Sequence, residues 1–341
     1  MNRRTLYNLW ITAVTTILLT ACQTIEPLTI DYLVPAEVSF PEELKRVAIV
    51  NNTPSIHLDQ MLIEEKETEK SYWGDGKRAA EALANTLAEG NYFDEVVICD
   101  SLLRVSGTQP TAHPLKTSEV NQLVSLLDVD FLISLEALII KSKRKMKYLP
   151  EWGISYGTID AKIYATTRIY LPNRQNAMAT IHSNDSIFWE ESAIHESDVR
   201  RQLPNDIEVR LQASDFAGTL PVPSLLPHWK SSQRYLYGGS NVNFRDALIY
   251  VREGNWEQAI ALWQKEFDGK STNRKKTAAY NMSVGYEMLD KIEEALRWID
   301  RALQLTKPET TEQLMMSLYK QELQQRLSDL QHLYLQTKRF D

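Results

Sequence analysis

The chain has 341 residues, of which 43% are hydrophobic and 24% charged, with a formal net charge of −7. This length predicts about two domains, and the acidic balance argues against bulk nucleic-acid binding, which needs a basic face. The two cysteines are Cys22 and Cys99, so no disulfide framework is expected and stability must come from packing.

A basic start and a short apolar run open the chain. Arg3 and Arg4 precede an apolar stretch at 9–21, which ends in Leu-Thr-Ala directly before Cys22. This layout is typical of a secretory signal, and the run is shorter than the about 20 apolar residues that span a bilayer. The Leu-Thr-Ala-Cys sequence resembles the lipobox of bacterial lipoproteins. The resemblance implies cleavage between Ala21 and Cys22 and attachment of diacylglycerol to the thiol of Cys22.

Residues 1–21 are therefore expected to be a lipoprotein signal peptide, and 22–44 a lipidated tether that binds membrane lipid through Cys22. The tether is expected because 23–40 contains two prolines, no helical period and no charge cluster. No acidic run follows Cys22, which favours an outer-membrane protein that faces the periplasm.

Residues 45–140 show alternating strand and helix patterns. The segment 77–89 has apolar residues at helical spacing, with Asp75 as a candidate N-cap and Gly90 as a candidate left-handed stop. Cys99 ends a short apolar run, where a small buried strand residue is expected rather than a nucleophile. The elements predicted here are strands at 46–51, 95–99 and 131–140, helices at 77–89 and 118–127, and a polar loop at 52–76.

A meander follows. Five cations between 141 and 147 could form a patch for phosphate-rich glycolipid or for an acidic partner. The favoured alternative is a solvated strand end or hairpin tip, where charges also prevent edge pairing. Apolar and polar residues alternate over 159–166, which predicts a half-buried antiparallel strand. A strand pair is expected across 177–181 and 186–190, and a helix over 206–217.

This order predicts an α/β domain with a mixed sheet over residues 45–218. The strand at 47–52, the helix at 77–89 and the helix-to-strand passage at 127–133 resemble the sheet domain of periplasmic lipoproteins of the curli-secretion type and of activators of penicillin-binding proteins. That resemblance implies an alternative function, an oligomeric assembly or secretion component built from this domain.

Residues 219–240 are expected to be a joint rich in proline and glycine, because Pro221, Pro223 and Pro227 exclude a regular helix. Beyond it the chain repeats. Tyr250 and Ala259 recur 36 residues later as Tyr286 and Ala295. The pattern resembles the tetratricopeptide repeat, which has a period of about 34 residues and two antiparallel helices per unit. All-α repeats are therefore expected over 241–341.

The last helix is predicted to open with a capping box at Thr310 and Gln313. Its apolar stripe either covers the end of the repeats or binds a partner helix. The repeat register places four residues on a concave groove that binds an envelope protein, although the same residues also suit an ordinary core between helices. These candidate partner-binding residues are Phe244, Leu248, Tyr280 and Val284.

The candidate catalytic motifs of the sequence are incomplete. His195 and Glu196 lack the second histidine of a zinc-protease helix, and the segment 74–77 lacks the spacing and the Ser or Thr of a phosphate loop. We therefore expect no enzyme, no cofactor and no metal. The sequence favours a membrane-anchored cell-envelope lipoprotein that acts as a non-enzymatic scaffold or adaptor through its helical repeats.

Overall fold

The computed structural model describes residues 25–54, 62–66, 68–99, 113–239 and 241–340. These residues form two compact units. The sheet unit comprises 35–228 and 335–341, and the helical unit comprises 25–34 and 229–334. The predicted fold class is confirmed, because an α/β region with a mixed sheet precedes an all-helical region of five helices. Ala21 and Cys22, the predicted cleavage and lipidation site, lie outside the described residues.

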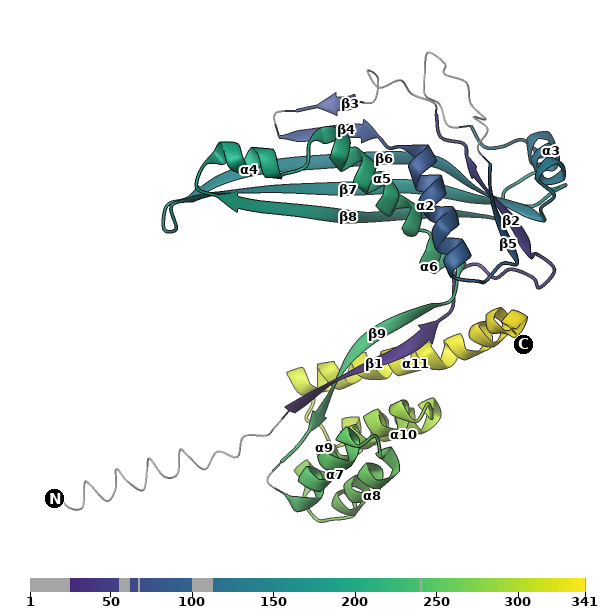
Figure 1. Ribbon diagram of the computed structural model, residues 1–341. Coiled ribbons are helices and arrows are strands. Elements are labelled where there is room, and N and C mark those ends of the chain that lie inside the picture. Colours follow the sequence, from purple (N-terminus) through teal and green to yellow (C-terminus); the bar gives the residue numbers. More distant parts are fainter. Residues whose placement is uncertain (1–24, 55–61, 67, 100–112, 240, 341) are drawn as a thin grey trace. The chain divides into compact units, whose positions relative to one another are not determined.

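Seven strands form the sheet of the sheet unit (Figure 1). The order is β3-β4-β6-β2-β5, while β7 pairs with the other edge of β6 and β8 pairs with β7. β2 runs parallel to β5 and β6, and the remaining pairs are antiparallel. The strands are β2 (Arg46–Asn51), β3 (Leu62–Glu65), β4 (Glu69–Trp73), β5 (Glu95–Cys99), β6 (Phe131–Leu149), β7 (Ile154–Tyr170) and β8 (Ala179–Ala193).

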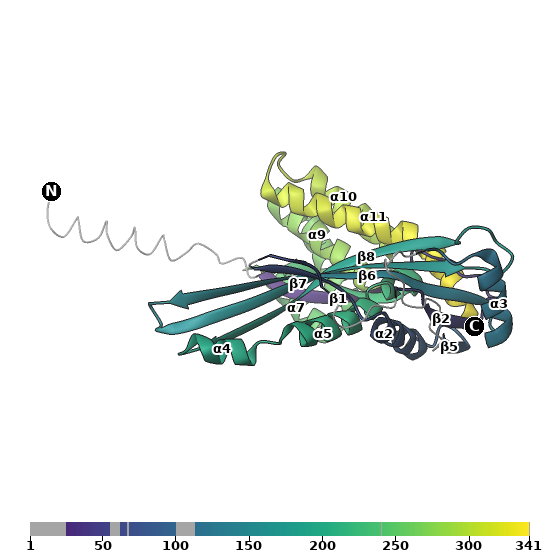
Figure 2. The same cartoon turned by 90° about the horizontal axis from the view of Figure 1, so that it is seen from above.

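Helices cover the two faces of this sheet unequally. α4 (Glu196–Gln202), α5 (Asp206–Thr219) and α2 (Gly76–Glu89) follow one another along one face (Figure 2), together with the short α6 (Val222–Leu225). α3 (Thr117–Leu127) packs on the opposite face, over the parallel strands and the end of β7. Those strands are therefore apolar on both sides, as parallel strands usually are. The longer antiparallel strands have one covered face.

Helix α2 begins and packs for local reasons. The Asp75 side chain accepts a hydrogen bond from the Arg78 amide at 3.2 Å, as the sequence predicted for the N-cap. The predicted left-handed stop at Gly90 is wrong, because Gly90 has φ −69° and the left-handed residue is Asn91, at φ 47°. Asparagine tolerates that region because its short side chain can hydrogen-bond locally.

Three strand predictions need correction. The predicted polar loop contains β3 and β4, because β4 adds to the second half of β6. The predicted strand at 131–140 is too short, because β6 continues through the basic stretch to Leu149. The exposed lysines alternate with residues that face the helices, in agreement with the favoured solvated strand end. The expected strand pair at 177–190 is the single strand β8. The polar residues between the two predicted strands do not form a turn but pair in register with β7.

The helical unit contains two helical hairpins and a long last helix. The two turns match at the 36-residue interval, because Gly254 (φ 74°) and Asp290 (φ 58°) both adopt the left-handed region. Ala259 and Ala295 are fully buried, which lets the second helix of each hairpin approach the first. The helices are α7 (Val242–Arg252), α8 (Trp256–Phe267), α9 (Thr272–Met288), α10 (Ile292–Gln304) and α11 (Thr311–Thr337), followed by η2 (Lys338–Phe340).

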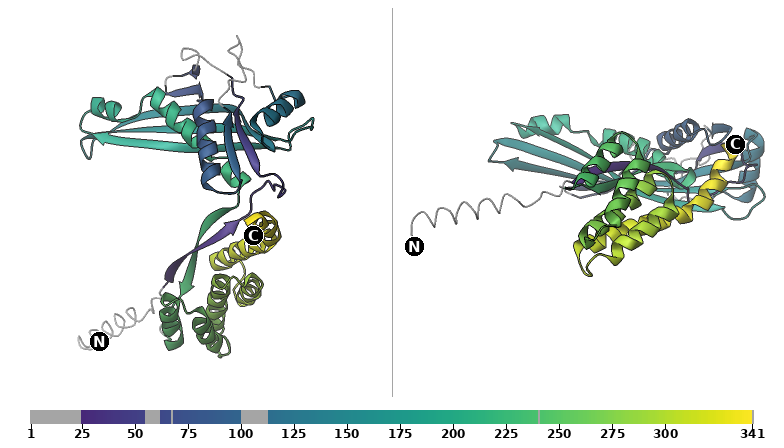
Figure 3. Two further views of the ribbon diagram at one scale, coloured as in Figure 1. Left: turned by 45° about the vertical axis from the view of Figure 1, so that its right-hand side comes forward. Right: turned by 90° about the horizontal axis from the view of Figure 1, so that it is seen from below.

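A two-stranded ribbon corrects both the predicted tether and the predicted joint. β1 (Ile25–Val34) pairs with β9 (His228–Tyr237), as Figures 1 and 3 show. Asp31 accepts a hydrogen bond from Ser231, and Thr29 from Gln233, an opposite progression that is typical of antiparallel strands. The expected tether therefore contains a strand of ten residues. Leu28, Ile30 and Tyr32 alternate with polar residues, a signal that could have predicted it.

The residues from Leu335 onward belong to the sheet unit, so the helical unit ends at Tyr334 and not at the predicted boundary, 341. Gln336 accepts a hydrogen bond from the Ala36 amide at 2.9 Å and donates to the Ala36 carbonyl at 2.9 Å. The Arg339 guanidinium lies 4.3 Å from the centre of the Tyr92 ring. Among the described helices, none has both the length and the apolar composition needed to span a membrane.

Candidate functional site

The four residues predicted to line a partner-binding groove are buried, so that prediction is wrong. Phe244 and Leu248 on α7, and Tyr280 and Val284 on α9, all belong to the core of the helical unit. The alternative that the sequence left open, a core between helices, describes them correctly.

The ribbon of β1 and β9 covers this side of the helices. The Tyr237 ring packs edge-on against Tyr280 with 5.2 Å between ring centres. The buried amide of Asn281 accepts a hydrogen bond from the Tyr237 amide at 3.0 Å and donates to the Tyr237 carbonyl at 2.7 Å. Ile30 and Tyr32 of β1 join the same core. The chain thus occupies with its own strands the surface that a partner was expected to fill.

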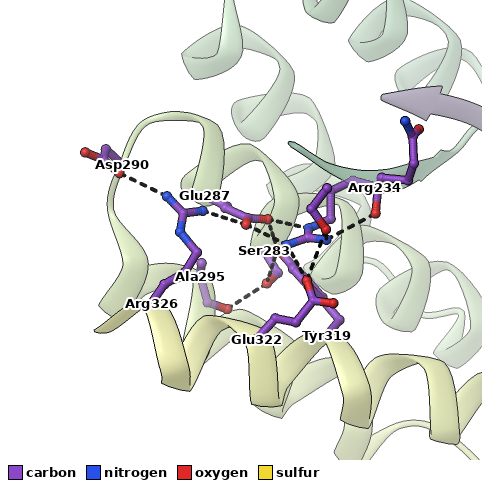
Figure 4. A network of polar contacts seen from close by, with 10 residues as sticks. Arg234, Ser283, Glu287, Asp290, Ala295, Tyr319, Glu322 and Arg326 are labelled. Atoms are coloured by element: carbon purple, nitrogen blue, oxygen red, sulfur yellow. Dashed lines mark hydrogen bonds and ion pairs between the residues drawn. The ribbon is translucent and has the colours of Figure 1, made fainter. Parts of the chain in front are cut away.

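A buried polar network fixes the ribbon and α11 to α9 (Figure 4). The Glu287 carboxylate, whose side chain is fully buried, accepts hydrogen bonds from Arg234 of β9 at 2.9 and 3.0 Å. It also accepts from Arg326 at 2.6 Å and from the Tyr319 hydroxyl at 2.8 Å, both on α11. Arg234 pairs in addition with Glu322 at 2.9 Å. Three elements therefore converge on one carboxylate.

Arg234 and Tyr319 of this network keep their protons near neutral pH. Burial lowers the pKa of Arg234, but the hydrogen bonds and charge of Glu287 outweigh it and leave the pKa above its usual value. Burial raises the pKa of Tyr319 well above its usual range, and the charge of Glu287 adds to this effect. Arg234 thus stays cationic and Tyr319 stays a donor. The network therefore stabilises the packing of β9 and α11 on α9 and does not transfer protons.

The first turns of α11 present an uncovered apolar stripe. Leu314, Met315 and Leu318 are 60%, 49% and 52% exposed, whereas Met316 and Tyr319 on the inner side are buried. We call these three exposed residues the α11 stripe. A solenoid normally buries such a face against the next helix. The α11 stripe is therefore the candidate interaction surface of the helical unit.

The start of α11 is held in place, so the stripe has a fixed position within the unit. Thr310 accepts a hydrogen bond from the Gln313 amide at 3.2 Å, as the predicted capping box requires. The Gln313 side chain accepts from the Glu309 amide at 2.8 Å, one residue earlier than in the standard box. Lys276 of α9 pairs with Glu312 at 2.6 Å.

Comparison with protein families gives two matches. The family described as a domain of unknown function, DUF8603, matches residues 44–237, which is more than half of the chain. The chain belongs to this family. In this DUF8603 protein a second domain of unknown function, DUF6340, matches 245–325, within the helical unit. None of the curated proteins matches the chain.

The sheet unit of this DUF8603 protein contains one buried carboxyl group that the sequence did not reveal. Glu136 lies at a bulge of β6 and is 3% exposed. It accepts hydrogen bonds from the Asn52 amide at 2.7 Å and the Tyr170 hydroxyl at 3.0 Å. Burial raises the pKa of Glu136, and the hydrogen bonds from Asn52 and Tyr170 oppose the rise. A glutamate within an apolar run gives no sequence signal of such partners.

The weak catalytic motifs have structural roles. His195 precedes α4, and Glu196 in its first turn pairs with Arg200. Asp75, in the segment considered as a phosphate loop, caps α2 and pairs with Arg210 at 3.4 Å. Across the described part of the chain, no three His, Cys, Asp or Glu side chains are grouped as metal ligands.

Proposed function

We propose that this protein is a lipid-anchored, non-enzymatic scaffold of the bacterial cell envelope, at the outer membrane and facing the periplasm. The lipobox ending at Cys22 supports the anchor, and one structural observation supports what the anchor holds. β1 begins at Ile25, three residues after Cys22. Three residues of chain reach at most about 11 Å. A lipid on Cys22 therefore keeps the start of β1 beside the membrane.

β1 is part of the helical unit, so this anchor holds that unit close to the bilayer. Glu26 of β1 pairs with Arg252 of α7 at 2.9 Å. The Arg326 guanidinium of α11 lies 4.4 Å from the centre of the Tyr32 ring. The proposed partner of the scaffold is therefore a protein that reaches the membrane surface.

The α11 stripe is the proposed binding surface. A helix that offers apolar side chains at i and i+4 suits an apolar groove or the apolar face of a partner helix. The stripe is small, so a few anchors must provide most of the affinity. A capture experiment from detergent-solubilised envelopes tests this surface.

We expect the lipidated protein to recover an envelope protein, and the double variant Leu314→Ser and Leu318→Ser to recover at least about tenfold less, because each lost anchor costs more than about 1 kcal/mol. The matched control is Ile249→Ser on α7, which removes an exposed apolar side chain from the same unit. Equal recovery by the double variant and the control would contradict the scaffold surface.

A second candidate function is oligomeric assembly through the sheet unit, and the edge strand β8 favours it. β8 has 15 residues in unbroken register with β7, and no strand of the described chain pairs with its outer edge. Phe188 on this strand is 57% exposed. A long regular edge is a template for pairing with another strand. A mass measurement that finds only monomers of the unlipidated protein would exclude this candidate.

A further inference from the structure

The face of the sheet opposite α4 and α5 carries a row of lysines. Ile140, Ser142 and Met146 of β6 point toward the helices, so the residues between them point to the other side. All the lysines of the row are exposed. We call this row the lysine face, made of Lys141, Lys143, Lys145 and Lys147 of β6 and Lys162 of β7.

The lysine face is electrostatically unbalanced. Lys141 and Lys162 are direct partners in the β6–β7 register, and like charges in such pairs are unfavourable. Lys143 pairs with Glu69 of β4. The other lysines of the face have no ion pair with a carboxylate of the described residues. This concentration of cations occurs in a chain with a net charge of −7, so it is local to this face.

A hollow lies among these lysines. It has a volume of about 360 Å³, and its wall combines five lysines with three acidic residues. The lysines are Lys66, Lys70, Lys141, Lys143 and Lys162, and the acidic residues are Glu64, Glu69 and Asp160. The Lys141 ammonium also lies 5.4 Å from the centre of the exposed Tyr164 ring. Lysines thus outnumber carboxylates around a space that can receive an anionic group.

The end of the same hairpin is apolar and aromatic. Trp152, in the turn between β6 and β7, is 72% exposed, and Tyr148 just before that turn is 59% exposed. Ile194 is 72% exposed and follows Ala193, which pairs with Ser155 at the start of β7. We call these three residues the hairpin tip. Tryptophan and tyrosine favour the interface between lipid headgroups and hydrocarbon.

We propose that the lysine face and the hairpin tip dock on the anionic phospholipid headgroups of a bilayer. Anionic headgroups complement the lysines, and the interface accepts the exposed rings at the end of the hairpin. An acidic protein would satisfy the lysines but would leave the apolar tip without a matching environment. This contact is made by the sheet unit alone and does not depend on an acyl chain at Cys22.

Vesicle co-sedimentation of the unlipidated chain tests the proposal. The chain from residue 22 onward with Cys22→Ser is mixed with vesicles of phosphatidylcholine alone or with about one third phosphatidylglycerol. We expect binding to the anionic vesicles only, and a steep loss of binding as salt rises. Replacing Lys141, Lys145, Lys147 and Lys162 by glutamine should weaken binding at least about a hundredfold, since each lysine contributes roughly fivefold near an anionic surface.

The matched control replaces four other exposed lysines by glutamine, with the same change in net charge; they are Lys45, Lys77, Lys230 and Lys270. We expect this control to bind almost as well as the parent chain. Trp152→Ala should weaken binding several-fold while leaving the salt dependence unchanged. Equal loss in the two lysine variants, equal binding to both kinds of vesicle, or binding to heparin without binding to vesicles would overturn the proposal.

Discussion

Two buried glutamates of this protein differ in what surrounds them. Glu287 has two arginines and a tyrosine hydroxyl, so its charge is compensated. Glu136 receives hydrogen bonds from the neutral Asn52 and Tyr170. Burial disfavours an ionised carboxylate, and at Glu136 it outweighs the hydrogen bonds and the charge of Arg168, so the pKa stays raised. The two carboxyl groups should therefore affect stability in opposite ways.

Replacing Glu287 by glutamine should lower the free energy of unfolding of the helical unit by about 3 kcal/mol. The reason is that Arg234 and Arg326 lose the charge that compensates them while Arg234 stays buried. Urea denaturation measures the change. Glu253→Gln, at an exposed position after α7, is the control and should change stability by less than about 0.5 kcal/mol. Equal stability of the two variants would contradict the assigned role of Glu287.

The raised pKa of Glu136 predicts a pH dependence. The folded protein keeps this proton at pH values where the unfolded chain, with a carboxyl pKa of about 4.3, has lost it. Stability should therefore fall as pH rises from that value to the pKa of the folded state, by about 1.4 kcal/mol for each unit of difference.

Glu136→Gln removes the titrating group and should abolish this part of the pH dependence. Guanidinium denaturation between pH 4 and pH 8 measures both proteins. If the parent and the variant lose stability in parallel over that range, the fall has another source and the account of Glu136 is wrong.

At the scale of elements, α2 and α5 pack closely because Gly218 has no side chain. A Cβ at Gly218 would lie 2.3 Å from the Ala79 carbonyl oxygen and 2.7 Å from the Ala82 Cβ. The backbone of α2 cannot move away without separating the helices. Gly218 thus sets the distance at which α2 and α5 cover the sheet.

Gly218→Ala should destabilise the sheet unit by about 1–3 kcal/mol, because the added methyl group overpacks the interface between α2 and α5. Thermal unfolding of the full chain checks this value. Gly239→Ala is the control, since a Cβ there has no neighbour closer than 4.0 Å. A melting temperature for Gly218→Ala that matches the control would show that the interface can accommodate a side chain.

Local periodicity predicted most helices and the buried parallel strands, because each buries one stripe or a short apolar run. The same periodicity did not predict the full lengths of β6 and β8, because polar residues on the open face of a sheet resemble turn residues. The pairing of β1 with β9 could not be predicted, for another reason. Asp31 and Ser231 meet across 200 positions of sequence, and no local pattern reports such a pairing.

At the scale of the whole molecule, the two-part fold could be predicted from the sequence, but the candidate site could not. The repeat register allowed Phe244 and Tyr280 to face either an open groove or a core between helices. It could not decide between the two, because it does not predict a strand that packs against these helices. The α11 stripe was not distinguished from the rest of the helix. Leu330 and Tyr334, farther along α11, are exposed as well.

The central claim is that a lipid on Cys22 holds the helical unit, through β1, at a membrane. Growth of producing cells with radioactive palmitate, followed by isolation of the protein, tests it most directly. We expect label in the parent protein and none in a Cys22→Ser variant that is produced in comparable amount. An unlabelled parent protein, or equal labelling of the variant, would contradict the account.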